Sequence, residues 1–343
     1  MSYLGKLSFE MVTIKDIAQM AGVSPSTVSR ALNDSPLISA ATKARIRQIA
    51  EELGYERNEL ARGLVKGASG ALGLIVPDIT NPFFAEIARG VSDVAHTRGY
   101  GVLLCTTEGD LSREAEYLRF LRRKRVDGLI LSAVTMDDPN LPELSHGSIP
   151  FVLVSRLVKG LNAPFVVGDD KTGARLAVEH LIKLGHERIA FIGGPANVQS
   201  SRDRMETYQE VLKEHGLKAY TKWSVFADFT QAAGRKAARE MLRGRARPTA
   251  IFAANDVIAL GVMEAAEDLG LSIPQDLSLV GYDDISYASL PRVQLTTVAQ
   301  PTYKMGRIAA EHLLGVIERG RQRKLARILR PRLVVRRTTA PPH

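Results

Sequence analysis

Apolar residues recur with a helical period near the start of the chain. Ile14, Ile17, Ala18 and Ala21 fall at i, i+3, i+4 and i+7, the spacing of one buried face of a short helix. Gly22 follows them and permits the left-handed conformation that often ends a helix. The pattern therefore predicts a helix that begins at Ile14 and ends before Gly22.

A second helical segment follows directly and runs from Pro25 to Asn33. Ser24 can cap it, and proline suits the first helical position, where no N–H is needed. Val28 and Leu32 lie on one face, while the other face carries small hydroxyl side chains and an arginine. Such a face suits close approach to base edges and phosphates. Two short helices joined by a tight glycine-containing turn predict a helix-turn-helix whose second helix enters the major groove of DNA.

A third helix is expected after Ser39, which can cap it, and before Gly54. Its apolar stripe consists of Ile46, Ile49, Ala50 and Leu53. Residues 59–65 then form a segment too short to be a stable helix by itself. Gly63 weakens that segment further, by about 1 kcal/mol relative to alanine. We therefore expect it to be ordered only when a partner holds it.

From Ala71 onward the pattern changes to short apolar strands that alternate with amphipathic helices. The first set of expected strands covers residues 71–77, 101–105, 127–131 and 151–154. A second set begins with a helix over 173–184 and continues with strands over 189–192, 250–253 and 277–280. Continuous apolar strands that alternate with helices are typical of parallel sheets covered on both faces. Two such sets predict two lobes with a cleft between them.

The first segment resembles the signature of the lactose-repressor/galactose-repressor family. The resemblance is carried by Thr13-Ile14-Lys15-Asp16-Ile17-Ala18, Ala21-Gly22-Val23-Ser24, Thr27-Val28-Ser29-Arg30-Ala31-Leu32-Asn33, Leu53-Gly54-Tyr55 and Asn58. It is specific because many positions recur at fixed spacing. It implies an all-α helix-turn-helix head and an α/β sensor of two doubly wound parallel-sheet lobes, similar to periplasmic binding proteins. It also implies a homodimeric transcriptional regulator, most simply a repressor, controlled by a small-molecule effector.

The same resemblance implies domain bounds. The head covers 1–57, a hinge covers 58–69, and the effector-binding and dimerisation sensor covers 70–343. Lobe 1 comprises 70–168 and 302–330, and lobe 2 comprises 169–301 and 331–343, because the chain of this fold crosses between the lobes three times.

DNA-contacting residues are also implied by the resemblance. They are Ile14, Lys15, Ser24, Pro25, Ser26, Thr27, Ser29, Arg30, Asn33, Thr42, Tyr55, Asn58, Ala61 and Leu64. Leu64 is the expected wedge, which enters the minor groove at the operator centre and kinks the duplex. The alternative for Leu64 is an ordinary hinge contact.

Ligands of open α/β sheets bind at the carboxyl ends of the strands, so the effector site is expected in the loops that follow the strands. The predicted effector-binding residues are Asn81, Phe83, Phe84, Ser155, Arg204, Phe229, Asn255 and Asp283. By the resemblance, Arg204 grips the effector with its planar fork, Phe229 stacks on a ring, and Asp283 accepts from hydroxyls or ring nitrogens. Such a set fits a small polyol or ring ligand, with a sugar or sugar derivative as the first expectation.

Each of these residues has a structural alternative. Phe83 and Phe84 suit an apolar core, and Asn81 and Asn255 suit helix caps.

The charged residues have alternatives too. Arg204 can form a surface ion pair with Asp203 or Glu206. Asp283 can belong to a solvated turn. Ser155-Arg156 departs from the Asp-Arg pair of many relatives, so a strong grip on a sugar diol at that position is in doubt.

Charge alone does not identify the partner. The chain of 343 residues has a net charge of +9 and a pI near 9.6, but the largest excess lies between Glu318 and Arg337. That tail reads as a solvated basic face, with non-specific phosphate attraction as the alternative, and the head is nearly balanced. The DNA prediction therefore depends on the helix-turn-helix pattern.

Several classes of protein are excluded by what the sequence lacks. No run approaches the roughly 18 apolar residues of a membrane span. The N-terminus shows no secretory signal, so a cytoplasmic protein with no membrane partner is expected. Residues 2–10 read as an extension, with Met11 as an alternative start. A single cysteine, Cys105, excludes an intramolecular disulfide and a cysteine-based zinc site.

An enzyme is not expected either. The chain has no G-x-x-x-x-G-K-[ST] loop, no G-x-G-x-x-G after the first strand and no G-x-S-x-G elbow. His180 and His186 lack metal-ligand spacing, so neither a metal nor a cofactor is expected. The expected partners are a pseudo-palindromic duplex DNA operator, a small-molecule effector and a second copy of the chain. The alternative function is a solute-binding receptor of the same lobed fold, against which the predicted head argues.

Overall fold

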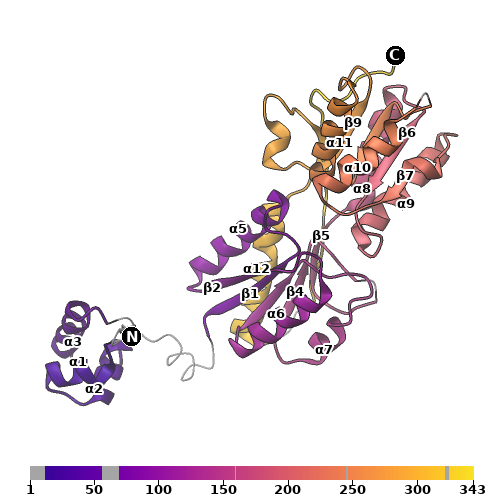
Figure 1. Cartoon of the computed structure of the whole chain (residues 1–343). Coiled ribbons are helices and arrows are strands. Elements are labelled where there is room, and N and C mark those ends of the chain that lie inside the picture. The colour runs from indigo at the N-terminus through magenta and orange to yellow at the C-terminus, as the bar shows by residue number, and fades with distance from the viewer. Residues whose placement is uncertain (1–11, 56–68, 159, 245, 321–323) are drawn as a thin grey trace, which may run out of the picture. The chain divides into compact units, whose positions relative to one another are not determined.

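The computed structural model describes residues 12–55, 69–158, 160–244, 246–320 and 324–343. The chain divides into two units, Met1–Gly67 and Ala68–His343, each of which is described separately below (Figure 1).

The first unit contains the three predicted helices, α1 (Ile14–Ala21), α2 (Pro25–Leu32) and α3 (Ala40–Glu52). The carboxylate of Asp16 accepts a hydrogen bond of 2.7 Å from the Thr13 N–H at the start of α1. Gly22 ends this helix with φ at 65°, a conformation that glycine adopts without steric cost. The apolar stripes of the three helices meet in one small core, which includes Ile17, Val28 and Ile46. The predicted helix-turn-helix fold is therefore present.

The second unit contains two six-stranded sheets. The first sheet has the strand order β11-β5-β4-β3-β1-β2, and all its pairs are parallel. Its strands are β1 (Ala71–Val76), β2 (Gly101–Thr106), β3 (Gly128–Leu131), β4 (Phe151–Val154), β5 (Phe165–Gly168) and β11 (Ala326–Leu329). Its helices are α5 (Pro82–Thr97), α6 (Leu111–Arg123), α7 (Leu141–His146) and α12 (Thr302–Arg319). We call this sheet with its helices lobe 1.

The second sheet has the order β12-β10-β9-β8-β6-β7. Its strands are β6 (Ile189–Gly193), β7 (Ser224–Phe226), β8 (Ala250–Ala253), β9 (Ser278–Asp283), β10 (Thr296–Ala299) and β12 (Arg332–Val334). Only β12 runs antiparallel to its neighbour among the pairs in this part of the structure. Its helices are α8 (Asp170–Lys183), α9 (Gln199–Glu214), α10 (Gln231–Leu242) and α11 (Asp256–Asp268), with the 3₁₀ turns η1 (Thr221–Trp223) and η2 (Ser286–Ser289). We call this sheet with its helices lobe 2.

Within the described residues the chain passes between the two sheets three times: after β5, after β10 and after β11. The second passage returns α12 to lobe 1, where it lies beside α5 (Figure 1). These two helices approach closely, because a Cβ added to Gly306 would lie 2.2 Å from the carbonyl oxygen of Ile87. Lobe 1 is therefore built from two stretches of chain that are far apart in sequence.

One helix boundary differs from the prediction in a way that matters for the site. Helix α8 begins at Asp170, three residues before the predicted start at Gly173. The Asp169 side chain caps it and accepts from the Thr172 N–H at 3.0 Å. The prediction was wrong because it followed the apolar stripe, which begins only in the second turn of this helix. The earlier start places Asp170 in a buried position.

Candidate functional site: an effector pocket and a DNA-reading face

One pocket of the second unit is lined by residues of both lobes. The predicted effector residues all line it, namely Asn81, Phe83, Phe84, Ser155, Arg204, Phe229, Asn255 and Asp283. Arg156 and Ser200 also line the pocket and were not among the predicted site residues. The structure therefore brings the carboxyl ends of strands from both sheets to one place.

The lobe 1 wall begins with Asn81 and two phenylalanines. The Asn81 Oδ1 atom accepts from the Phe83 N–H at 3.0 Å and so caps α5. The rings of Phe83 and Phe84 form an edge-to-face pair with centroids 5.0 Å apart. Both rings belong to the lobe 1 core and also line the pocket. Asn81 is therefore a helix cap and the two phenylalanines are core residues, as the alternatives stated, and all three also line the pocket.

Ser155 and Arg156 complete the lobe 1 wall at the end of β4. The Ser155 Oγ lies 2.7 Å from the Oγ of Ser132, and its backbone is left-handed with φ at 61°. The Arg156 Nη1 donates to the carbonyl oxygen of Ala133 at 3.0 Å. Burial lowers the pKa of Arg156 to about 10, so the guanidinium remains cationic at neutral pH. Both pocket residues are thus fixed by the segment that follows β3.

Arg204 is the main cation on the lobe 2 side. Its Nε and Nη2 donate to Asp170 Oδ1 at 2.9 and 2.7 Å, and its Nη1 donates to the Ala254 carbonyl oxygen. The guanidinium also lies 3.6 Å from the ring centroid of Tyr282. Burial alone disfavours its charge, but the negative charge of Asp170 raises the pKa of Arg204 above its ordinary value. The alternative of a surface pair is wrong, and the fork is oriented by a carboxylate that was not predicted.

Asp283 is the carboxylate of lobe 2 that lines the pocket. It is buried, its backbone φ is 113°, and its Oδ1 accepts from Gln300 Nε2 at 2.8 Å. Burial raises its pKa to about 7, against the opposing effect of Arg204. A solvated turn is therefore the wrong description. Gln300 also lies against β5, because a Cβ at Gly168 would come within 2.2 Å of its Oε1.

The remaining lobe 2 residues are an aromatic ring and a helix cap. Phe229 packs directly on Gly194, where an added Cβ would lie 2.2 Å from the ring Cζ. The Asn255 Oδ1 accepts from the Ile258 N–H at 2.8 Å and caps α11. As in lobe 1, a helix cap thus also lines the pocket.

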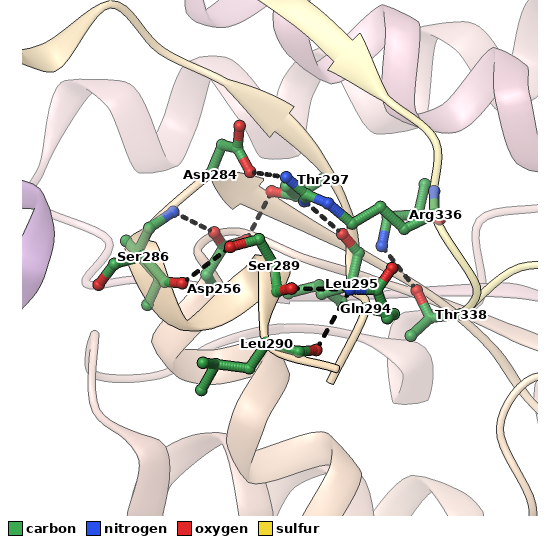
Figure 2. Close-up of polar contacts among 12 residues, drawn as sticks. Asp256, Asp284, Ser286, Ser289, Leu290, Gln294, Leu295, Thr297, Arg336 and Thr338 are labelled. Carbon is green, nitrogen blue, oxygen red and sulfur yellow. Dashed lines mark hydrogen bonds and ion pairs between the residues drawn. The ribbon is translucent and has the colours of Figure 1, made fainter. Parts of the chain in front are cut away.

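Figure 2 shows the polar network that surrounds η2. Arg336 Nη2 lies 2.6 Å from Asp284 Oδ1, and Nη1 donates to the Leu295 carbonyl oxygen at 2.8 Å. Asp256 accepts from the Ile285 N–H at 2.8 Å and from the Thr297 hydroxyl at 2.5 Å. Asp256 and Asp284 directly follow two pocket residues, Asn255 and Asp283. Arg336 is therefore a structural residue, and its assignment to a solvated basic face is wrong.

The predicted DNA-reading face lies on the first unit. Among the predicted residues, Lys15, Ser24, Pro25, Ser26, Arg30 and Asn33 are exposed, and Ile14, Thr27, Ser29, Thr42 and Tyr55 are half-buried. Ile14 and Tyr55 pack partly against the core of the head. The hydroxyl of Ser24 lies 2.8 Å from that of Ser26. Asn58, Ala61 and Leu64 lie outside the described residues.

Within residues 12–343, leaving aside the undescribed positions, no cluster of three or more His, Cys, Asp or Glu side chains is placed to hold a metal ion. His186 is held between Thr249 and the Ala340 carbonyl oxygen, at 2.9 Å from each. No helix in the described part of the chain is both long and apolar enough to cross a membrane.

Comparisons with known proteins agree with this architecture. Residues 13–58 match bacterial regulatory proteins of the lacI family, and residues 178–339 match a periplasmic binding protein-like domain. The chain is 40% identical to a ribose operon repressor of Halalkalibacterium halodurans, over 96% of this chain and 97% of that protein.

Two solved structures are also similar. One is the lac repressor dimer bound to operator and the anti-inducer ONPF, with a TM-score of 0.85, 28% identity and coverage of 96% and 100% of the two chains. The other is a LacI family transcriptional regulator from Enterococcus faecium with bound ribose, with a TM-score of 0.70, 32% identity and coverage of 79% and 99%.

The head, the two-lobed sensor and these similarities lead to one assignment. A receptor without a gene-regulatory role is set aside, since the match at residues 13–58 is to the DNA-binding part of regulators. The chain belongs to the lacI family of bacterial regulatory proteins, and it is an effector-controlled, DNA-binding transcriptional repressor rather than an enzyme.

Proposed function

We propose that the effector of this repressor is a monosaccharide, with a pentose such as ribose as the first candidate, and that it binds between the two lobes. The observation that carries the proposal is the pocket itself, in which an arginine, a carboxylate, an asparagine and aromatic rings meet. The names of two similar proteins, a ribose operon repressor and a regulator with bound ribose, support the choice of sugar.

The pocket chemistry suits a small ring with several hydroxyls. Phe83, Phe84 and Phe229 offer apolar surfaces from opposite lobes, against which a sugar ring can pack. Arg204 and Asp283 supply a charged donor and a charged acceptor, which form stronger hydrogen bonds to hydroxyls than neutral groups do.

The head binds the operator through the exposed face of α2. In our proposal Ser24, Pro25, Ser26, Arg30 and Asn33 lie in the major groove, and the remaining predicted residues contact the backbone or the adjacent groove. Two heads of a homodimer then require a two-fold operator with half-sites about one helical turn apart. Leu64 is the proposed minor-groove wedge. A protein with this role acts on DNA in the cytoplasm.

The sensor controls the head through the proposed hinge at residues 58–69. Effector binding favours one arrangement of the lobes. In this proposal, that arrangement sets the spacing between the two hinges of the dimer, and the spacing decides whether the hinge segment is ordered. Such coupling is typically about 1–3 kcal/mol and is reciprocal, so operator DNA must change sugar affinity by the same factor.

The test of the effector is a thermal-shift titration of the full chain with D-ribose, D-xylose, D-glucose and hypoxanthine. We expect stabilisation by the pentoses, with D-ribose strongest, because a ligand that binds only the folded state raises the melting temperature. Stabilisation by hypoxanthine alone, or by none of the four compounds, would overturn the sugar assignment.

The test of the DNA-binding residues is a gel shift with duplexes selected from a random pool. Specific binding should outlast non-specific binding as the salt concentration rises. Leu64→Ala should weaken operator affinity and leave ribose-induced stabilisation unchanged. Equal operator affinity of this variant and the wild type would remove the wedge role.

A further inference from the structure

Two buried carboxyl groups lie together in lobe 1, outside the effector pocket. Glu114 lies in the first turn of α6 and is 1% exposed, and Asp138 lies between β3 and α7 and is 6% exposed. Their side chains are within hydrogen-bonding reach of each other. In the described part of the chain, Glu114 Oε1 and Asp138 Oδ2 have no hydrogen-bond donor. Two carboxylate oxygens can bond to each other only when a proton lies between them.

Asp138 belongs to the segment of residues 132–140, which we call the frame loop. This loop holds both polar residues of the lobe 1 wall that follow β4. Ser132 bonds to the Ser155 hydroxyl at 2.7 Å, and the Ala133 carbonyl oxygen accepts from Arg156 at 3.0 Å. The position of the frame loop therefore sets the position of Ser155 and Arg156 in the pocket.

The frame loop also reaches lobe 2. The Met136 N–H donates to the carbonyl oxygen of Asn197 at 2.8 Å. Asn197 lies just before α9, the helix that carries the pocket residues Ser200 and Arg204. One loop thus frames the lobe 1 wall and makes a hydrogen bond across the cleft.

Within lobe 1 the frame loop is tied to α6 at its far end. Asp138 Oδ1 accepts from the Asn140 N–H at 2.9 Å, and Asn140 Nδ2 donates to the Leu111 carbonyl oxygen at 3.3 Å. A second polar link to α6 is the contact between the Asp138 and Glu114 side chains.

We propose that Glu114 and Asp138 share one proton, and that this proton holds the frame loop in the place that the effector pocket requires. The two residues act as a positioning pair, since neither lines the pocket. The inference rests on the proposed function for its link to effector binding, whereas the proton itself is independent of which ligand binds.

The electrostatic surroundings agree with a shared proton. Burial and the neighbouring Asp138 carboxylate raise the pKa of Glu114 to about 8, and the positive charge of Arg156 opposes this rise. Arg156 faces the pair from the loop after β4 and is itself repelled by Arg204 of lobe 2. One negative charge on the pair balances Arg156, whereas two negative charges would leave one buried charge without a partner.

The direction of the pH dependence follows from these groups. While the frame loop is in place, Glu114 keeps its proton up to a pH of about 8. Once the loop opens and water reaches the Glu114 carboxyl group, this group loses its proton near its ordinary pKa. Opening therefore becomes easier as the pH rises between these two values. The limit for one linked proton is about tenfold per pH unit.

The decisive experiment is hydrogen exchange of the ligand-free full chain, read by mass spectrometry on peptides that cover the frame loop. Exchange is measured near pH 6 and near pH 8 and corrected for the intrinsic rate of exchange. We expect the protection factor of the wild-type frame loop to decrease from pH 6 to pH 8, by a factor of up to about one hundred. Glu114→Gln keeps a neutral donor to Asp138 and should flatten this fall. Glu116→Gln, an exposed position on the same helix, is the matched control and should behave as the wild type.

Identical pH profiles in the wild type and Glu114→Gln would overturn the shared proton. Should that variant fail to fold, Asp138→Asn applies the same test from the other side of the pair.

A second readout tests the link to the pocket. The ratio of the D-ribose Kd at pH 8 to that at pH 6 should be larger in the wild type than in Glu114→Gln. Asp283 also titrates in this range, but it is common to both proteins and cancels from the comparison. Equal ratios would overturn the positioning role. A chain that binds no ribose at either pH contradicts the proposed sugar, while the exchange experiment still decides the shared proton.

Discussion

The two lobes fix their halves of the effector pocket in different ways. In lobe 2 the charged groups are held by side chains from two separate segments, with Arg204 paired to Asp170 of α8 and Asp283 bonded to Gln300 after β10. In lobe 1 the corresponding wall, Ser155 and Arg156, is held by a hydroxyl and a carbonyl oxygen of a single loop. The lobe 2 half is therefore organised before any ligand arrives. The lobe 1 half depends on whether its loop stays in place.

The largest expected effect of a single substitution comes from the lobe 2 ion pair. Arg204→Leu leaves Asp170 buried without its cation, and removal of one partner from such a pair costs about 3–5 kcal/mol of stability. Urea unfolding at neutral pH measures this loss, and D-ribose binding should disappear with it. Arg202→Leu, an exposed neighbour on the same helix, should unfold close to the wild type. Addition of Asp170→Asn should recover part of the lost stability. If the double variant is no more stable than Arg204→Leu, the pair does not explain the loss.

The next effect is a difference between the lobes in how their stability depends on pH. The pKa of Asp283 is raised from 3.8 to about 7, so this group stabilises the fold fully below pH 3.8, and that contribution is lost as the pH rises to about 7. The difference in unfolding free energy between the wild type and Asp283→Asn should fall by at most about 1.4 kcal/mol per pH unit in that window. It should be flat above pH 7. For Glu114→Gln the corresponding fall should continue to about pH 8. Urea unfolding at several pH values gives both curves, and coincident curves would contradict a separate titration in each lobe.

A smaller effect is expected at the aromatic wall of lobe 2. Phe229→Ala removes a half-buried ring and should weaken D-ribose affinity by about 1.5–3 kcal/mol, read by isothermal titration. Phe226→Ala removes a more exposed ring from the same lobe and should leave affinity unchanged. An equal loss in both variants would point to general weakening of lobe 2 rather than to contact with the sugar.

The smallest expected effect is a gain in lobe 1. Ser155→Asp places a carboxylate beside Arg156, and aspartate tolerates the left-handed backbone at this position. A charged acceptor for sugar hydroxyls should strengthen D-ribose binding by about 1 kcal/mol, roughly fivefold. Ser155→Asn has the same shape without the charge and should show no such gain. If both variants bind equally well, charge at this position is irrelevant to the sugar.

Much of this pocket was predictable because its residues obey local rules. Asn81 and Asn255 lie in the loops after β1 and β8, and Asp283 ends β9. Parallel strands bring their carboxyl ends to one edge of a sheet. The family resemblance then indicated which residues of these loops belong to the effector site. The same local rules predicted the helices of the head, whose stripes and caps lie within a few residues of each other.

The missed residues depend on contacts that a local pattern does not encode. Asp170 meets Arg204 across 34 positions of sequence, and its helix was expected to begin only at Gly173. The sequence did contain a signal, since Asp169 precedes Thr172 with the spacing of a helix cap. Glu114 carried a signal as well: it lies four and seven residues before Leu118 and Leu121, on the apolar stripe of its helix. Whether such a carboxyl group is buried beside another one is decided only by the tertiary fold.

The repeated passage of the chain between the sheets has a consequence for biosynthesis. Helix α12 supplies Met305, Ala309, Leu313 and their neighbours to the core of lobe 1, and β11 adds the last strand of its sheet. A nascent chain that has emerged only as far as β5 therefore lacks a large share of the apolar surface that this lobe must bury. Lobe 1 cannot reach its final form until nearly the whole polypeptide has left the ribosome, so a nonsense mutation before Thr302 should yield a product that is degraded rather than a partial sensor.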